Sequence, residues 1–280
     1  MSDHARAARE LRLAAQRGEI VARYQPQVDL HDGRLVALEA LSRWRHPERG
    51  LLGPNTFIPA AEASGSVHMI GDVMLEAACR YGADLARSGR RIEIAVNVAA
   101  GQLADDGFAE NVAARLARSG MPGHLLTVEL TETRPTPAAA PGALARVRRI
   151  GVGVSIDDVR SVAEAETRMR ELPVTELKVD RSVIGRLPQD REVAAALVRY
   201  AREFGLRIVA EGVETWPQLI AVRELGFDRA QGFLLGRPVP PERITASRAD
   251  RPTRNRNPKN RTRTPTRCSE SSARGLTRLG

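Results

Sequence analysis

The sequence predicts an α/β protein whose strands close into a modified TIM-like (β/α)8 barrel. Short apolar runs alternate with helical stretches along most of the 280-residue chain, which is typical of parallel strands joined by crossover helices. The number of these units favours a closed barrel over an open doubly wound sheet. Polar side chains repeatedly follow the apolar runs, as expected where strand ends meet at the mouth of a barrel.

The first part of the chain departs from this alternation. Residues 1–19 are charged and rich in alanine, and they predict an amphipathic N-terminal helix. Residues 21–28 and 35–41 are strand-like, and the turn signal Asp32-Gly33 between them predicts a hairpin. Two further helical stretches are expected next, at 55–64 and 70–88.

From residue 91 onward, strands and helices are expected in strict alternation, which indicates a parallel sheet. The expected strands are 91–98, 124–131, 152–157, 175–179, 206–211 and 227–230. The expected helices are 107–119, 140–149, 162–171, 191–204 and 215–224. We therefore assign residues 20–246 to one barrel domain.

The C-terminal segment, residues 247–280, has a different composition. From Arg248 to Gly280 there are ten Lys and Arg residues and two acidic residues, so this segment carries +8 of the net charge of +9. Few apolar residues accompany them, which predicts a disordered basic tail. A nucleic-acid-binding protein acting through this tail is a less favoured alternative, because no aromatic residue lies among the arginines to stack on bases.

Several classes of protein are disfavoured by composition. No apolar stretch reaches the roughly 20 residues that a membrane helix needs, and the N-terminus has no apolar signal core. We therefore expect a cytoplasmic protein without a membrane span. Cys79 and Cys268 are isolated, and the five histidines have no ligand-like spacing, so a zinc site is not predicted.

Carboxylates gather at the ends of the apolar runs. They repel one another unless cations share the site, and oxygen ligands suit Mg²⁺ or Mn²⁺ better than zinc. Two ions near adjacent acids could clamp the attacking and leaving oxygens of a phosphodiester. A single acid at such a place could instead cap a helix, which explains the whole set poorly. The set contains the acids Glu39, Glu129, Asp157, Asp158 and Glu211, with Asn97, Lys178 and Gln231 at equivalent places.

These residues lie in motifs that follow one another between about residues 20 and 245. The motifs are Tyr24-Gln25-Pro26, Glu39-Ala40-Leu41-Ser42-Arg43-Trp44, Val96-Asn97-Val98, Glu129-Leu130-Thr131-Glu132, Asp157-Asp158, Leu177-Lys178-Val179-Asp180, Ala210-Glu211-Gly212-Val213-Glu214 and Ala230-Gln231-Gly232-Phe233. In this set the chain resembles the EAL-domain family of bacterial cyclic-di-GMP phosphodiesterases. The resemblance implies an EAL barrel that opens cyclic di-GMP to linear pGpG with two ions of Mg²⁺ or Mn²⁺.

The resemblance also implies roles for single residues. One metal would be held by Glu39, Asn97, Glu129 and Asp157, and Asp157 would be shared with a second metal beside Asp158. Lys178 would contact the hydrolytic water, and Glu211 and Glu39 would complete the catalytic set. Substrate would be bound by Gln25, Leu41, Arg43 and Gln231. Behind these residues, Asp180 and Glu214 would orient Lys178, and Glu132 would contact the loop after Asp158.

That loop departs from the family pattern. Family members usually carry Phe-Gly-Thr-Gly-Tyr-Ser-Ser-Leu, whereas residues 159–166 read Val-Arg-Ser-Val-Ala-Glu-Ala-Glu. The lost glycines remove backbone freedom, so we expect Asp158 to be held less firmly, the second cation to bind more weakly and hydrolysis to be slow. The loop also contributes to dimers in the family, so a homodimer would be weakened.

Two hypotheses about activity remain open from the sequence. The first is an active phosphodiesterase, which the complete set of metal ligands favours. The second is a cyclic-di-GMP receptor that scarcely hydrolyses and acts through protein contacts, which the altered loop favours. Only about twenty residues precede Tyr24, so a regulatory input is expected to come from a separate sensory or signalling partner.

Overall fold

The computed structural model describes residues 3–130, 137–170 and 172–244. Glu132 and the predicted basic tail at 247–280 lie outside these residues. Within them, none of the helices combines the length and the apolar character that a membrane crossing requires.

Eight strands close into a barrel, which confirms the predicted fold class. Strands β2 and β4 to β9 are parallel neighbours in that order, and β1 closes the barrel by pairing antiparallel with both β2 and β9. A short strand, β3 (Gly50–Leu52), extends β2 as a hairpin outside the barrel. The barrel strands are β1 (Ile20–Asp29), β2 (Leu35–His46), β4 (Glu93–Val98), β5 (Leu126–Leu130), β6 (Gly153–Val159), β7 (Glu176–Val179), β8 (Arg207–Ala210) and β9 (Arg229–Gln231).

The predicted hairpin at the start of the barrel forms because its turn is stabilised locally. Asp29 Oδ1 accepts hydrogen bonds from the backbone N–H groups of His31 and Asp32, at 2.7 and 3.2 Å. Gly33 has a φ of 75°, which glycine adopts at little cost. The second pairing of β1, with β9, was not predicted from the sequence.

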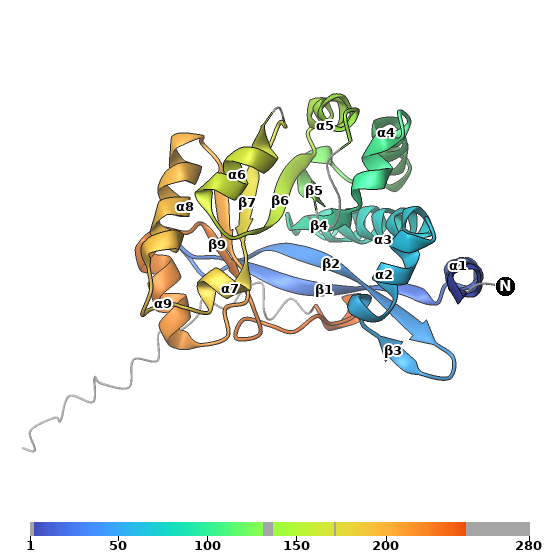
Figure 1. Cartoon of the computed structure of the whole chain (residues 1–280), viewed down its shortest axis with the longest axis horizontal. Coiled ribbons are helices and arrows are strands. Elements are labelled where there is room, and N and C mark those ends of the chain that lie inside the picture. The colour runs from blue at the N-terminus through green and yellow to red at the C-terminus, as the bar shows by residue number, and fades with distance from the viewer. Residues whose placement is uncertain (1–2, 131–136, 171, 245–280) are drawn as a thin grey trace, which may run out of the picture.

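The helices form an outer layer around the strands, as Figure 1 shows. The predicted helices are present, with bounds within a few residues of those expected, and the short α7 was not predicted. They are α1 (Asp3–Gln16), α2 (Pro54–Ala63), α3 (Val67–Arg87), α4 (Phe108–Ser119), α5 (Ala140–Arg149), α6 (Val162–Met169), α7 (Arg181–Ile184), α8 (Glu192–Glu203) and α9 (Trp216–Leu225).

A network of ion pairs lies at the amino ends of the strands, opposite the strand ends that carry the predicted site. Glu93, the first residue of β4, accepts hydrogen bonds from Arg229 at 2.5 and 3.1 Å and from Arg207 at 2.9 and 3.3 Å. Glu176, at the start of β7, accepts a further bond from Arg207 at 2.5 Å. The hydrogen bonds of the two arginines lower the pKa of Glu93 although burial acts in the opposite direction. These ion pairs therefore balance the charges of partly buried side chains at the end of the barrel opposite the predicted site.

Candidate active site

The carboxyl ends of the strands bring the predicted site residues to one mouth. Asn97 lies on β4, Glu129 on β5, Asp157 on β6, Lys178 on β7 and Gln231 on β9, while Glu211 follows β8. Glu39 joins them from β2, where it pairs in register with Gln25 of β1. Each residue sits next to buried apolar strand positions, which explains why a repeating sequence pattern could identify them.

The ammonium group of Lys178 lies among four carboxylates. Its Nζ atom is 2.6 Å from Glu211 Oε1, 3.0 Å from Glu129 Oε2, 3.1 Å from Asp157 Oδ1 and 3.7 Å from Glu39 Oε2. The side chains of Lys178 and Glu129 have no solvent exposure. One buried cation therefore neutralises only part of the negative charge of this group.

The electrostatics of the site follow from this arrangement. Burial lowers the pKa of Lys178, but the four carboxylates outweigh it, so the pKa is well above its usual value and the amine stays protonated. Burial raises the pKa of Glu129 and that of Glu211 well above the usual range, and the neighbouring acids add to the rise. Glu129 Oε1 is buried and has no hydrogen-bond partner within the described parts of the chain. The site thus has acidic oxygens left over for a cation.

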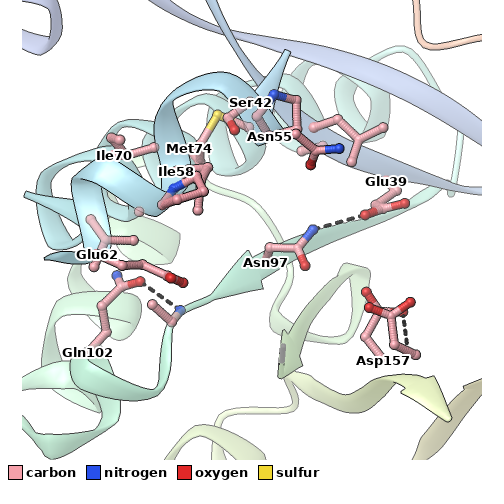
Figure 2. A pocket seen from close by; sticks show the side chains of 18 residues that line it. Glu39, Ser42, Asn55, Ile58, Glu62, Ile70, Met74, Asn97, Gln102 and Asp157 are labelled. Carbon is pink, nitrogen blue, oxygen red and sulfur yellow. Dashed lines mark hydrogen bonds between the residues drawn. The ribbon is translucent and has the colours of Figure 1, made fainter. Parts of the chain in front are cut away.

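Two overlapping sets of acids have the spacing of cation sites. Oxygen atoms of Glu39, Glu129 and Asp157 lie within 4.8 Å of one another, and so do those of Asp157, Asp158 and Glu211. Asp157 belongs to both sets. Asn97, the amide expected beside the first set, donates from Nδ2 to Glu39 Oε1 at 2.9 Å, and Figure 2 shows this pair on the same side of the pocket as Asp157.

Asp158 has an unusual backbone. Its φ of 58° is the only positive φ at a non-glycine position in the described part of the chain, and the pairing of β6 with β7 shifts register around it. Its N–H donates to Asp157 Oδ1 at 3.0 Å. Burial, then the neighbouring acids Asp157 and Asp180, raise the pKa of Asp158 to about 6.

A chain of glutamine side chains positions Glu39 from the other side. Gln231 Nε2 donates to Glu39 Oε2 at 2.6 Å and to Gln25 Oε1 at 3.2 Å. Gln27 Nε2 donates to Gln231 Oε1 at 2.9 Å and fixes the orientation of that amide. Gln27 was missed from the sequence, although its spacing of two residues from Gln25 on a strand indicates the same face.

A pocket of about 450 Å³ opens beside these acids. Glu39, Asn97, Asp157, Asp158 and the predicted Leu41 line it. The opposite wall comes from α2 and α3 and was missed, because these helices precede the β/α alternation and carry no strand-end signal. Residues of this wall include Asn55, Ile58, Glu62, Ile70 and Met74.

The other predicted residues have varied positions. Arg43 is partly buried and lies on β2 at every second position with Glu39 and Leu41, so the three share one face of the strand. Arg43 does not line the pocket. Its Nη1 donates to the carbonyl of Ser42 at 2.7 Å. Asp180 has no hydrogen bond or ion pair with Lys178; it caps α7 by accepting from Ser182 N–H at 2.8 Å. Glu214 is exposed, and its side chain has no ion pair with Lys178 in the described residues.

Comparison with known proteins assigns the fold to a family. The sequence profile of the EAL domain matches residues 8–238. The chain belongs to the EAL-domain family. This match spans the barrel from the first helix to the segment after β9, so it includes every strand that carries a site residue.

Curated relatives share much of this EAL domain's sequence. The bifunctional diguanylate cyclase/cyclic di-GMP phosphodiesterase MucR of Pseudomonas aeruginosa is 40% identical over 246 residues, which is 85% of this chain and 36% of MucR. The cyclic di-GMP phosphodiesterase NbdA of the same organism is 40% identical over 244 residues, 82% of this chain and 30% of NbdA. The chain thus spans about a third of the length of these relatives.

A solved structure of similar sequence has the same EAL fold. The MucR phosphodiesterase in complex with c-di-GMP superimposes with a TM-score of 0.77 at 37% identity, covering 86% of this chain and all of that one. The EAL domain of FimX from Xanthomonas citri, in complex with c-diGMP, superimposes with a TM-score of 0.78 at 22% identity. The second likeness supports the fold alone.

Proposed function

We propose that this EAL domain is a phosphodiesterase that hydrolyses cyclic di-GMP to linear pGpG with two divalent cations, Mg²⁺ or Mn²⁺. The observation that carries the proposal is a group of five acids, four of them around Lys178, which borders a pocket of about 450 Å³. The volume suits a small-molecule substrate. The likeness to the c-di-GMP complex of MucR supports the choice of substrate.

The residues present fit divalent cations. Glu129 Oε1 has no hydrogen-bond partner among the residues that the structure describes, although it is buried, and leaving such a group unpaired is costly unless something binds it. Glu39, Glu129 and Asp157 would hold one ion, with Asn97 beside them, and Asp157 would share a second ion with Asp158 and Glu211. Bound cations would neutralise charge on the phosphodiester and acidify an attacking water.

The side chains would divide the remaining work between them. Lys178 stays protonated, so it acts as a hydrogen-bond donor and fixed charge that holds the carboxylates together, and it orients the water rather than taking a proton from it. Glu211 is the candidate proton acceptor in its ionised form, which the ammonium group of Lys178 favours against the effect of burial; its side chain is 15% exposed at the mouth, whereas that of Glu129 is fully buried. Gln231 and Asn97 orient Glu39 through its two oxygens.

The pocket walls would bind the rest of the substrate. The apolar side chains of Ile58, Ile70 and Met74 present a dry surface to a planar base. Arg43 is the predicted phosphate-binding cation on β2 and would meet a phosphate group if its guanidinium turned from the carbonyl of Ser42. Leu41 also lines the pocket.

The proposal is tested by incubating the purified chain with cyclic di-GMP and Mn²⁺ or Mg²⁺, with the products separated by chromatography. We expect linear pGpG to accumulate, and excess EDTA to stop its formation. Binding of cyclic di-GMP without cleavage under every cation condition would show a receptor instead. Cleavage that persists in EDTA would contradict the assigned role of the acids.

A further inference from the structure

Arg168 on α6 joins the ends of two neighbouring barrel strands. Its Nη2 donates to the carbonyl oxygen of Leu130, the last residue of β5, at 2.9 Å, and its Nη1 donates to the carbonyl oxygen of Asp157 on β6 at 2.5 Å. Leu130 directly follows Glu129, and Asp157 belongs to both sets of acids. One guanidinium therefore fixes the backbone next to two proposed cation ligands.

Arg168 is itself held by Glu164 of the same helix, and Glu164 is held in turn by the residues just before that helix. Glu164 Oε1 lies 3.4 Å from Arg168 Nη1, one helical turn away, and Glu164 Oε2 accepts the backbone N–H of Arg160 at 3.1 Å. Ser161 caps α6 by accepting the N–H of Glu164 at 3.2 Å. The side chains of Arg168 and Glu164 are only 16% and 19% exposed, so water competes little for these bonds.

The backbone between these anchors needs such support. Residues with a side chain seldom adopt the positive φ of Asp158, and such a conformation persists only where surrounding contacts impose it. Arg168 holds the carbonyl of Asp157 immediately before this residue, and Asp180 N–H donates to the carbonyl of Val159 immediately after it, at 3.0 Å. Arginine suits this task because its planar fork can reach two carbonyls at once, which an ammonium group cannot do with fixed geometry.

We propose that Arg168, supported by Glu164, is a positioning residue for the second cation site, formed by Asp157, Asp158 and Glu211. The Arg168–Glu164 pair fixes the ends of β5 and β6 in a chain whose residues 159–166 lack the glycines that are usual in the family. The consequence for hydrolysis rests on the proposed function, whereas the consequence for cation binding does not.

The test compares Arg168→Lys and Arg168→Met with the same changes at Arg199. Arg199 is exposed on the adjacent α8 and has no hydrogen bond or ion pair with the part of the chain that the structure describes. Calorimetric titration with Mn²⁺ alone measures cation affinity, kinetics with cyclic di-GMP give kcat and KM, and thermal unfolding reports Tm. Arg168→Lys retains the charge and loses the fork, so it serves if Arg168→Met fails to fold.

We expect Arg168→Lys to weaken the lower-affinity Mn²⁺ site by about tenfold, because groups that orient metal ligands typically contribute about 10- to 100-fold to affinity or activity. The kcat value should fall by a similar factor with KM changed less than about threefold, and the Arg199 variants should match the wild type. Unchanged Mn²⁺ affinity would overturn the proposal, whether Tm falls, KM rises or nothing changes. If the wild type does not cleave cyclic di-GMP, the proposed function fails and the Mn²⁺ titration still decides the role of Arg168.

Discussion

The ammonium group of Lys178 lies 2.6 Å from Glu211 Oε1, and the Lys178 side chain has no solvent exposure. Three more carboxylates lie within 3.7 Å of the same nitrogen. Lys178 therefore lowers the repulsion among the acids. It leaves some of their carboxylate oxygens available to bind cations. The stability of the site should thus depend on Lys178 most strongly when cations are withheld.

Replacing Lys178 by methionine should destabilise the metal-free protein by about 3–5 kcal/mol, since removing one partner of a buried ion pair leaves uncompensated charge. Added Mn²⁺ should restore more stability in Lys178→Met than in the wild type, because divalent cations replace the lost positive charge. Urea unfolding in EDTA and in Mn²⁺ measures both effects. Equal stabilisation of the two proteins by Mn²⁺ would contradict this account.

Loss of the Glu39 carboxylate should strongly reduce turnover and spare the fold. Glu39→Ala removes a cation ligand and the acceptor of the bonds from Asn97 and Gln231, so we expect hydrolysis to fall by about a hundredfold or more. The circular dichroism spectrum should remain that of the wild type. Glu48→Ala, an exposed acid after the same strand, is the matched control and should retain full activity.

The ion pairs at the amino ends of the strands predict a pH-dependent stability. The pKa of Glu93 is lower in the folded protein than its unfolded value of about 4.3. Its stabilising effect is therefore present above about pH 4.3 and disappears as the pH falls through the lowered folded value. Glu93→Gln should lose about 3 kcal/mol at pH 7, and the difference from wild type should shrink in acid.

The control for this change is Glu110→Gln. Glu110 is 65% exposed and lies 3.5 Å from Arg146, so its loss should change the unfolding free energy by less than about 1 kcal/mol. Urea unfolding of both variants between pH 3 and pH 7 checks the expectation. A penalty at Glu93 that stays constant over this range would show that charge is not its source.

The sequence predicts the barrel and most of the mouth because both follow from a repeating pattern. A polar residue after each apolar run identifies Asn97, Glu129, Asp157 and Lys178, since strand ends of one barrel share one face. The pairing of β1 with β9 leaves no such pattern in the sequence, because the alternating residues of β1 are compatible both with an isolated hairpin and with a closed barrel. Each further omission has its own physical cause.

The pocket wall from α2 and α3 depends on tertiary packing, which brings Met74 and Glu62 opposite the strand ends. The role of Arg168 is hidden for a different reason: its acceptors are backbone carbonyls, which every residue carries. An arginine on a helix face is most simply interpreted as a solvated charge. Only the three-dimensional structure shows that this one reaches two strand ends.

These contacts change what is expected of the loop after Asp158. From sequence alone, replacing residues 159–166 with Phe-Gly-Thr-Gly-Tyr-Ser-Ser-Leu should raise the rate, since a misplacement near 1 Å can cost about a hundredfold. In the structure, however, the exchange replaces Glu164, which supports Arg168, by serine. At position 161 it puts threonine in place of the serine that caps α6, and threonine can also cap a helix. The exchange would add backbone freedom and remove an existing anchor at the same time.

We therefore predict that the exchanged loop gives no gain: kcat for cyclic di-GMP should stay within about threefold of the wild type or fall below it. Mn²⁺ affinity should follow kcat, because both depend on how firmly Asp157 and Asp158 are held. Arg168→Lys should cost less in the exchanged protein than in the wild type, since Arg168 has already lost Glu164 there. A rise in kcat of tenfold or more would contradict this expectation. It would show that the glycines hold Asp157 and Asp158 better than Arg168 does, and that the wild-type loop impairs hydrolysis.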